Sequence, residues 1–243
     1  MKISILNAKA DEDLKDRRAF IQQSVKMAAV TGLTGLTLFS ACAKSDEEEG
    51  QKVSPPEDLM QEHGLLNRIL LIYDACHLHL INKESFNKQD LGDAAGIIKT
   101  FIEDYHEKQE EQSIFPRFRK ANQLTELVNV LLQQHAAGRA VTAKIIQLTS
   151  NKNLTDVENQ QLLTSLVQFT TMYRPHESRE DTILFPAFRK LVSSHEYDAL
   201  GEEFEKNEKK KFGEDGFESV LNKVESLEKR FNLYELAQFT PKI

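Results

Sequence analysis

The sequence has no tryptophan, and its 243 residues include only two cysteines, six prolines and ten glycines. Two cysteines rule out a disulfide framework. The scarcity of glycine and proline leaves few helix breakers, and the helix-forming residues Leu, Glu, Lys, Gln and Ala are abundant. A net charge of −7 argues against nucleic acid as a partner. The composition therefore predicts an all-helical protein.

No apolar run is long enough to span a bilayer, which takes about 20 apolar residues. The longest one, residues 27–39, suits the core of a signal peptide. Residues 16–21, DRRAFI, resemble a twin-arginine export signal, and residues 38–42, LFSAC, resemble a bacterial lipoprotein cleavage box. The alternative is a buried helix or simple anchor with a chance arginine pair.

The lipoprotein resemblance implies cleavage after residue 41 and lipidation of Cys42. Residues 1–41 are then the signal peptide, and the polar, acidic residues 42–56 form a flexible tether. We expect an exported lipoprotein of the periplasm or cell envelope that meets the membrane through its lipid anchor only.

The rest of the chain is organised around a repeated segment. Residues 106–120, HEKQEEQSIFPRFRK, and residues 176–190, HESREDTILFPAFRK, agree at eight of fifteen positions. Each copy contains His-x-x-x-Glu, and residues four apart lie on one helix face about 6 Å apart along the axis. An imidazole and a carboxylate at that spacing can bind one metal ion or two adjacent ions. Two such pairs on two helices predict a di-metal carboxylate site.

Periodic apolar positions predict four helices, over residues 54–80, 91–115, 124–148 and 156–185. His63 and His135 occupy the apolar seams of the first and third helices, with the spacing typical of a bundle. Burying such groups without partners would cost several kcal/mol each, so a cation is expected among them. We also expect Pro175 to distort the fourth helix just before His176.

The pattern H…HxxxE…H…HxxxE, with Phe-Pro after each pair, resembles the hemerythrin-like HHE cation-binding family over about residues 57–190. The resemblance implies an up-down four-helix bundle. It also implies a non-haem di-iron centre, in which two iron ions share an oxo or hydroxo bridge and two carboxylate bridges. Carried over position by position, the metal ligands would be His63, His106, Glu110, His135, His176 and Glu180.

The sequence departs from the oxygen-carrying hemerythrins at two places. Arg139 stands where those proteins have a second histidine on the third helix. Their last carboxylate is an aspartate five residues after its histidine, and here both Glu180 and Asp181 are available; the repeat favours Glu180. Glu107 and Glu177 are further alternative ligands, but they point about 100° away and are expected to be solvated charges.

Fewer imidazoles imply a more open cluster, and Gly138 is expected to leave room beside it for a small ligand. Such a site could bind O₂, nitric oxide or peroxide, and whether it turns one of them over is left open. The alternatives are an iron sensor, buffer or store without turnover, and a purely structural metal such as zinc. Residues 191–243 are expected to add two helices, the first capped by Ser194, that pack on the bundle or mediate a homodimer.

Overall fold

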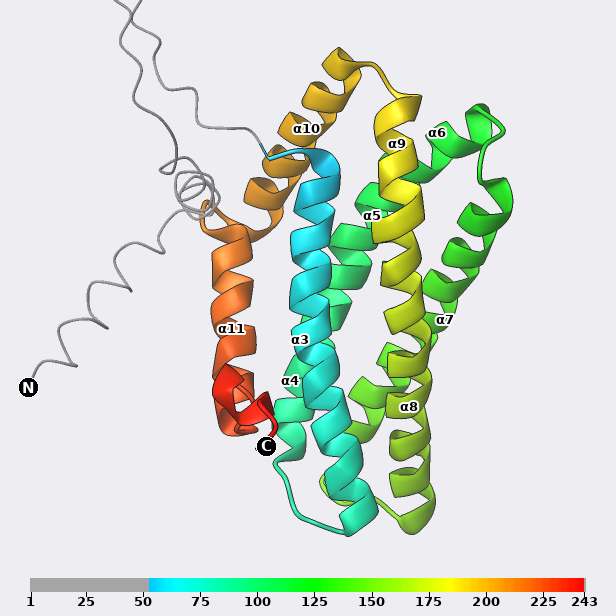
Figure 1. The fold of residues 1–243 in the computed structure, drawn as a ribbon. Coiled ribbons are helices and arrows are strands. Elements are labelled where there is room, and N and C mark those ends of the chain that lie inside the picture. Colours follow the sequence, from blue (N-terminus) through cyan, green and yellow to red (C-terminus); the bar gives the residue numbers. More distant parts are fainter. Residues whose placement is uncertain (1–52, 243) are drawn as a thin grey trace, which may run out of the picture. The chain divides into compact units, whose positions relative to one another are not determined.

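The computed structural model describes residues 53–242 (Figure 1). The predicted signal peptide, Cys42 and most of the tether, through residue 52, lie outside the described residues. Within the described range the chain is helical and has no strand, which confirms the prediction of an all-α fold. Four long helical rods run up and down to form the bundle, and further helices follow it in the chain.

The first rod is a single helix, α3 (Pro55–Asn82). Ser54 caps it by accepting a hydrogen bond from the backbone of Glu57, whose side chain accepts one in return from the Ser54 backbone. This capping box satisfies N–H groups that a helix start otherwise leaves unpaired. Ser54 is therefore the cap that the sequence predicts, with proline in the first turn.

The second and fourth rods are assembled from several segments, and the third is a single helix. In chain order the segments are α4 (Lys88–Ile97), η1 (Ile98–His106), α5 (Glu107–Gln109), η2 (Glu110–Ile114), α6 (Phe115–Lys120), α7 (Thr125–Ser150), α8 (Asp156–Arg179), η3 (Glu180–Leu184) and α9 (Phe185–Leu191). The segments η1, η2 and η3 are π-helical. The second and fourth rods thus run several residues beyond their predicted ends.

Two of the π-helical turns have a cause in the repeat. η2 begins at Glu110 and η3 at Glu180, and each ends just before a Phe-Pro pair. A proline inside a helix cannot donate the usual hydrogen bond, and its ring crowds the carbonyl four residues back. A wider turn ahead of the proline relieves that crowding, and such turns are frequent at functional sites. Phe-Pro therefore shapes the backbone at both glutamates of the His-x-x-x-Glu pairs.

The expectation of a distorted helix just before His176 is wrong. α8 continues as a regular α-helix through Pro175, and the widened turn comes after His176, in η3. Pro175 lies on the exposed side of α8, so water can bind the carbonyl that the proline leaves unpaired.

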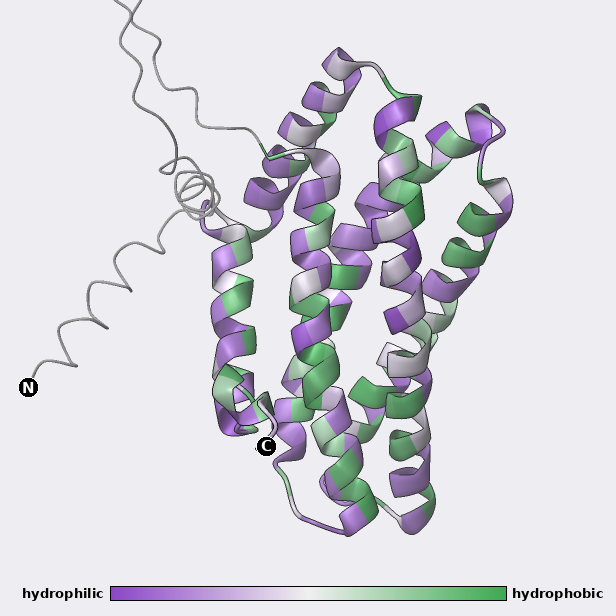
Figure 2. Ribbon diagram, in the orientation of Figure 1, coloured by the Kyte–Doolittle hydropathy of each residue, from purple (hydrophilic) through white to green (hydrophobic). Residues whose placement is uncertain are grey.

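The bundle interior contains two apolar clusters with a polar layer between them. One cluster includes Tyr73, Phe101 and Phe169, and the other includes Phe118 and Phe188. Burying one such aromatic side chain contributes roughly 1.5–3 kcal/mol. Hydrophobic and hydrophilic residues alternate around each helix, as amphipathic helices of a bundle require (Figure 2).

Residues 194–242 contain α10 (Ser194–Phe212), α11 (Gly216–Arg230) and a short 3₁₀ turn, η4 (Leu236–Phe239). The cap of α10 is Ser193, one residue before the predicted Ser194. Both helices pack along α3, so the extension covers one side of the bundle (Figure 1). None of the described helices is long and apolar enough to cross a bilayer.

Candidate metal centre

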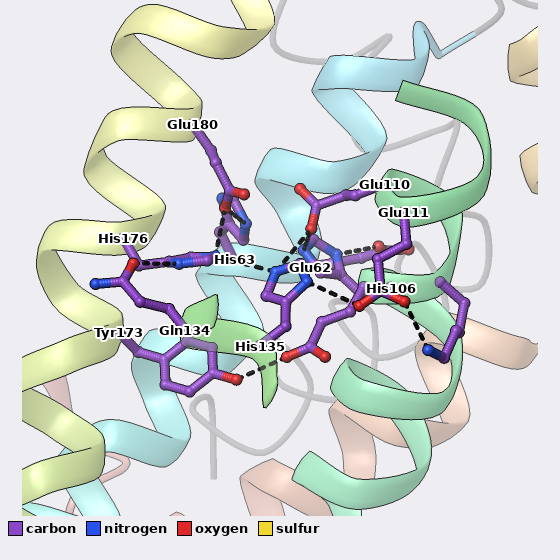
Figure 3. A network of polar contacts seen from close by, with 12 residues as sticks. Glu62, His63, His106, Glu110, Glu111, Gln134, His135, Tyr173, His176 and Glu180 are labelled. Carbon is purple, nitrogen blue, oxygen red and sulfur yellow. Dashed lines mark hydrogen bonds and ion pairs between the residues drawn. The ribbon is translucent and has the colours of Figure 1, made fainter. Parts of the chain in front are cut away.

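The polar layer contains the six residues that the sequence singles out, and all of them are buried. His63 comes from α3. His106 is the last residue of η1 and Glu110 is the first residue of η2, on either side of the short helix α5. The other three, His135, His176 and Glu180, come from α7, α8 and η3. Figure 3 shows these side chains converging from all four rods on one region.

The six side chains form two groups of three, each with metal-ligand spacing. One group is His63, His106 and Glu110, and the other is His135, His176 and Glu180. Within each group the candidate ligand atoms all lie within 4.8 Å of one another. The structure therefore holds two adjacent positions at which a cation could be bound.

Each glutamate faces two histidines, one from each group. Glu180 Oε2 lies 3.1 Å from His176 Nε2 and 3.4 Å from His63 Nε2. Glu110 Oε2 lies 3.5 Å from His135 Nε2 and 3.7 Å from His106 Nε2. This is the arrangement expected of two carboxylates that bridge a pair of metal ions.

The donor set fits metal ions on two further grounds. Two ligand atoms about 2.1 Å from one ion, at an angle of about 90–110°, are roughly 3.0–3.4 Å apart, close to most of these distances. Both carboxylate oxygens of Glu110 and of Glu180 lack a hydrogen-bond partner among the described residues, although neither side chain is exposed. Burying a carboxylate in this way is costly unless a cation compensates it.

Each histidine is oriented by a polar neighbour on its outer nitrogen. The Nδ1 atom of His63 lies 2.8 Å from Asp181, and that of His106 lies 2.7 Å from Glu62. A neighbour that accepts the Nδ1 proton leaves Nε2 free to bind a cation. All four imidazoles share this arrangement, in the pairs His63–Asp181, His106–Glu62, His135–Glu111 and His176–Gln134.

The pKa shifts in the layer show that a bound cation would replace protons. Burial and the nearby Glu180 raise the pKa of Glu110 well above its usual value. Burial alone would lower the pKa of His63, but the neighbouring carboxylates of Asp181 and Glu180 raise it to about 10. Burial and the neighbouring His63 lower the pKa of His106 well below its usual value. Without a metal, protons must therefore balance the buried carboxylates.

Three alternative ligands lie outside the six-residue layer. Asp181 contacts the outer nitrogen of His63. Glu107 and Glu177 are only 1% and 3% exposed, so the expectation that they are solvated is wrong. A residue 100° off the inner face of a helix packs against the next helix rather than facing water. Glu177 accepts a hydrogen bond from Asn67, and burial raises the pKa of Glu177 to about 8.

Glu107 belongs to a network on the α7 side of the layer. The hydroxyl of Tyr173 donates a hydrogen bond to Glu107 at 2.6 Å, and Arg139 donates to both Glu107 and Glu111. Arg139, standing where oxygen carriers have a histidine, thus orients two carboxylates beside the layer.

The expectation that Gly138 leaves room for a small ligand is wrong. A Cβ atom at Gly138 would lie 2.2 Å from the hydroxyl oxygen of Tyr173, so the phenol already fills that space.

The orienting residues Glu62, Glu111 and Gln134 were missed by sequence reasoning. Each is the direct sequence neighbour of a layer residue, which is a signal available in the sequence. That signal is weak by itself, because most helical positions of this chain have a polar neighbour.

Comparison with known proteins adds evidence independent of this geometry. Residues 54–188 match the hemerythrin HHE cation-binding domain. Uncharacterised proteins of Mycobacterium bovis and of Mycobacterium tuberculosis H37Rv are each 39% identical to this chain over 237 residues. These alignments cover 93% of this chain and 91% of each relative, well beyond the matched domain. No solved structure matches the chain significantly.

Proposed function

We propose, from the premise that this chain belongs to the hemerythrin HHE cation-binding domain family, that it binds two iron ions and presents them to O₂, nitric oxide or peroxide. The observation that carries the proposal is the position of Glu110 and Glu180. Each faces one histidine of both groups, with no other partner for its oxygens among the described residues.

In this proposal His63 and His106 would hold one ion, His135 and His176 would hold the other, and Glu110 and Glu180 would be shared between the two ions. Imidazole and carboxylate together suit iron, and six protein ligands leave coordination positions open on two ions. Bound iron would supply a redox-active Lewis acid at those open positions.

The surroundings of the layer favour a small apolar or weakly polar molecule. Phe115 stacks on His135 and Phe185 stacks on His63, with ring centroids 5.6 and 5.7 Å apart. These rings close the layer on the side of the second apolar cluster and exclude water there. On the opposite side Tyr173 packs 5.4 Å from His176. A site enclosed by aromatic rings strengthens electrostatic interactions within it.

The second candidate is an iron sensor, buffer or store without turnover. The observation that favours it is the partner on every Nδ1 atom, since such partners strengthen metal retention. Both candidates share the same ligands, and they differ in what the iron does after binding.

The test is to load the full chain with ferrous iron without air and to follow visible spectra after adding O₂, nitric oxide or peroxide in turn. A reversible adduct indicates a carrier or sensor, and catalytic consumption indicates an enzyme. His106→Ala should lose both iron and the spectral change, whereas replacement of the exposed His195 by alanine should preserve both. Inertness of the iron-loaded protein toward all three molecules would overturn the proposal in favour of storage or buffering.

We further propose export through the signal-like segment and anchoring through a lipid on Cys42, which the sequence pattern supports. Cys42→Ser should then move the protein from the membrane fraction to the soluble fraction of the cell envelope. An unchanged distribution would contradict the lipid anchor and leave the metal site untouched.

A further inference from the structure

A second polar cluster lies in the bundle interior, outside the six-residue layer. Tyr73 of α3, Glu103 of η1 and Thr142 of α7 are each 0% exposed. The Tyr73 hydroxyl, both oxygens of Glu103 and the Thr142 hydroxyl have no hydrogen-bond partner of ordinary geometry among residues 53–242. Three buried polar side chains from three helices rarely remain unsatisfied, so buried water or a proton is expected among them.

The three side chains act on one another although they make no ordinary hydrogen bond. The hydroxyl of Thr142 lies beside Glu103, and burial together with the nearby Glu103 raises the pKa of the Tyr73 hydroxyl. A bridging water could join the phenol and the hydroxyl to the carboxyl group and satisfy the groups that lack a partner. The cluster is therefore a candidate hydration site.

Glu103 and Glu107 are four residues apart on the same helical face, but their partners differ. Glu107 accepts hydrogen bonds from the Tyr173 hydroxyl and from the Arg139 guanidinium. Glu103 has a weaker partner, the Lys99 ammonium, 3.4 Å from Glu103 Oε2 and closer, at 2.8 Å, to Asp104. Two adjacent buried carboxylates are rarely both ionised, so the proton belongs on Glu103.

The titratable groups that act on Glu103 come from three rods of the bundle. Lys99 and Glu107 share its rod, Tyr73 faces it from α3, and Tyr173 faces it from α8. Burial and the charge of Glu107 raise the pKa of Glu103, while Thr142 and Lys99 offset part of that effect. Lys99 is 43% exposed, so the outer edge of the cluster reaches solvent.

We propose that Glu103 is a proton store of the bundle, a neutral carboxylic acid that shares buried water with Tyr73 and Thr142 and regains its proton from solvent beside Lys99. Its position suits proton delivery, because Glu103 lies three residues before the layer residue His106 in the same helical segment, η1. The store itself follows from the cluster, and only its use depends on the function proposed above.

The proton stored on Glu103 would be used if the centre reduces peroxide, because that reaction consumes protons. Reduction of one peroxide molecule to two waters consumes two electrons and two protons. Two bound ferrous ions would supply one electron each, Glu103 would supply one proton through buried water, and the second proton would come from solvent. Solvent at the Lys99 side then returns a proton to the Glu103 carboxylate. A centre that only binds O₂ or nitric oxide reversibly consumes no proton and does not need this store.

The store is tested by infrared spectroscopy on the iron-loaded full chain at neutral pH. The C=O stretch of a protonated carboxylic acid is separate from the bands of ionised carboxylates. Glu103→Gln should remove one such band, and Thr142→Val should shift it by removing a neighbouring hydroxyl. Glu203→Gln is the matched control, because Glu203 is exposed on α10. A spectrum of Glu103→Gln identical to that of the control would overturn the proposal.

The use of the proton is tested separately by the rate of peroxide consumption. Glu103→Gln should bind iron normally but lower this rate at least about tenfold and remove its solvent isotope effect. A rate and isotope effect equal to those of the control would refute delivery from Glu103. Inertness of the wild-type centre would refute the proposed function instead, and the infrared band would still report whether Glu103 stores a proton.

Discussion

Replacing Gly138 by alanine tests how closely α7 and α8 approach beside the metal layer. The added Cβ would lie 2.2 Å from the Tyr173 hydroxyl oxygen and 2.8 Å from its ring carbon Cε2. Atoms cannot remain that close, so the Tyr173 ring must move. The movement breaks its hydrogen bond to Glu107, which the structure holds at 2.6 Å in the interior.

The magnitude follows from three contributions to the free energy of unfolding. Overpacking a close helix contact costs about 1–3 kcal/mol. A buried hydrogen bond to a charged group contributes about 1.5–3 kcal/mol. Alanine gains about 1 kcal/mol over glycine in helix propensity. We therefore expect Gly138→Ala to destabilise the protein by about 1.5–5 kcal/mol.

Gly64 supplies the matched control, because it lies in α3 and a Cβ there would meet nothing within 4 Å. Gly64→Ala should therefore stabilise the protein, by up to about 1 kcal/mol. Urea denaturation of the two variants in the metal-free state measures the difference. Equal stability of Gly138→Ala and Gly64→Ala would show that Tyr173 does not occupy the space beside Gly138.

Three further predictions concern the layer and the extension. Gln134→Leu removes the partner of His176 Nδ1 and should weaken iron binding about 10–100-fold, measured by competition with a chelator. His63, with a pKa of about 10, must lose its proton to bind a cation, so iron binding should release protons and tighten as pH rises toward 10; proton uptake in weakly buffered solution would contradict this. Arg68→Ala removes the ion pair between α3 and Glu228 of α11, in which Arg68 is 31% exposed. The change should lower the free energy of unfolding by about 1–2 kcal/mol and speed amide hydrogen exchange in α11. Unchanged exchange in α11 would show that the pair does not hold the extension.

The helices and the convergence of the six side chains could be predicted because both follow from periodicity. Residues spaced four and three apart on an apolar seam must face the interior, whatever surrounds them. The His-x-x-x-Glu repeat further predicts that two helices each place a histidine and a glutamate at the same level along the bundle axis. The structure accordingly brings His63 and His135 into the layer with the repeat.

The rest depends on contacts between residues distant in sequence. The space beside Gly138 is filled by Tyr173 from the next helix, which the spacing within α7 cannot reveal. The burial of Glu107 likewise depends on Arg139 and Tyr173 of neighbouring rods. The π turns were missed for another reason. Proline was expected to distort the helix near Pro175, whereas the widened turn precedes the proline of each Phe-Pro pair.

The measurement that tests the central claim most directly is the number of iron ions bound per chain after anaerobic loading and removal of free iron by gel filtration. Two groups of three buried side chains, joined by Glu110 and Glu180, predict two ions per chain. Replacing either glutamate by alanine should reduce that number. One ion or none in the unaltered protein would contradict the account.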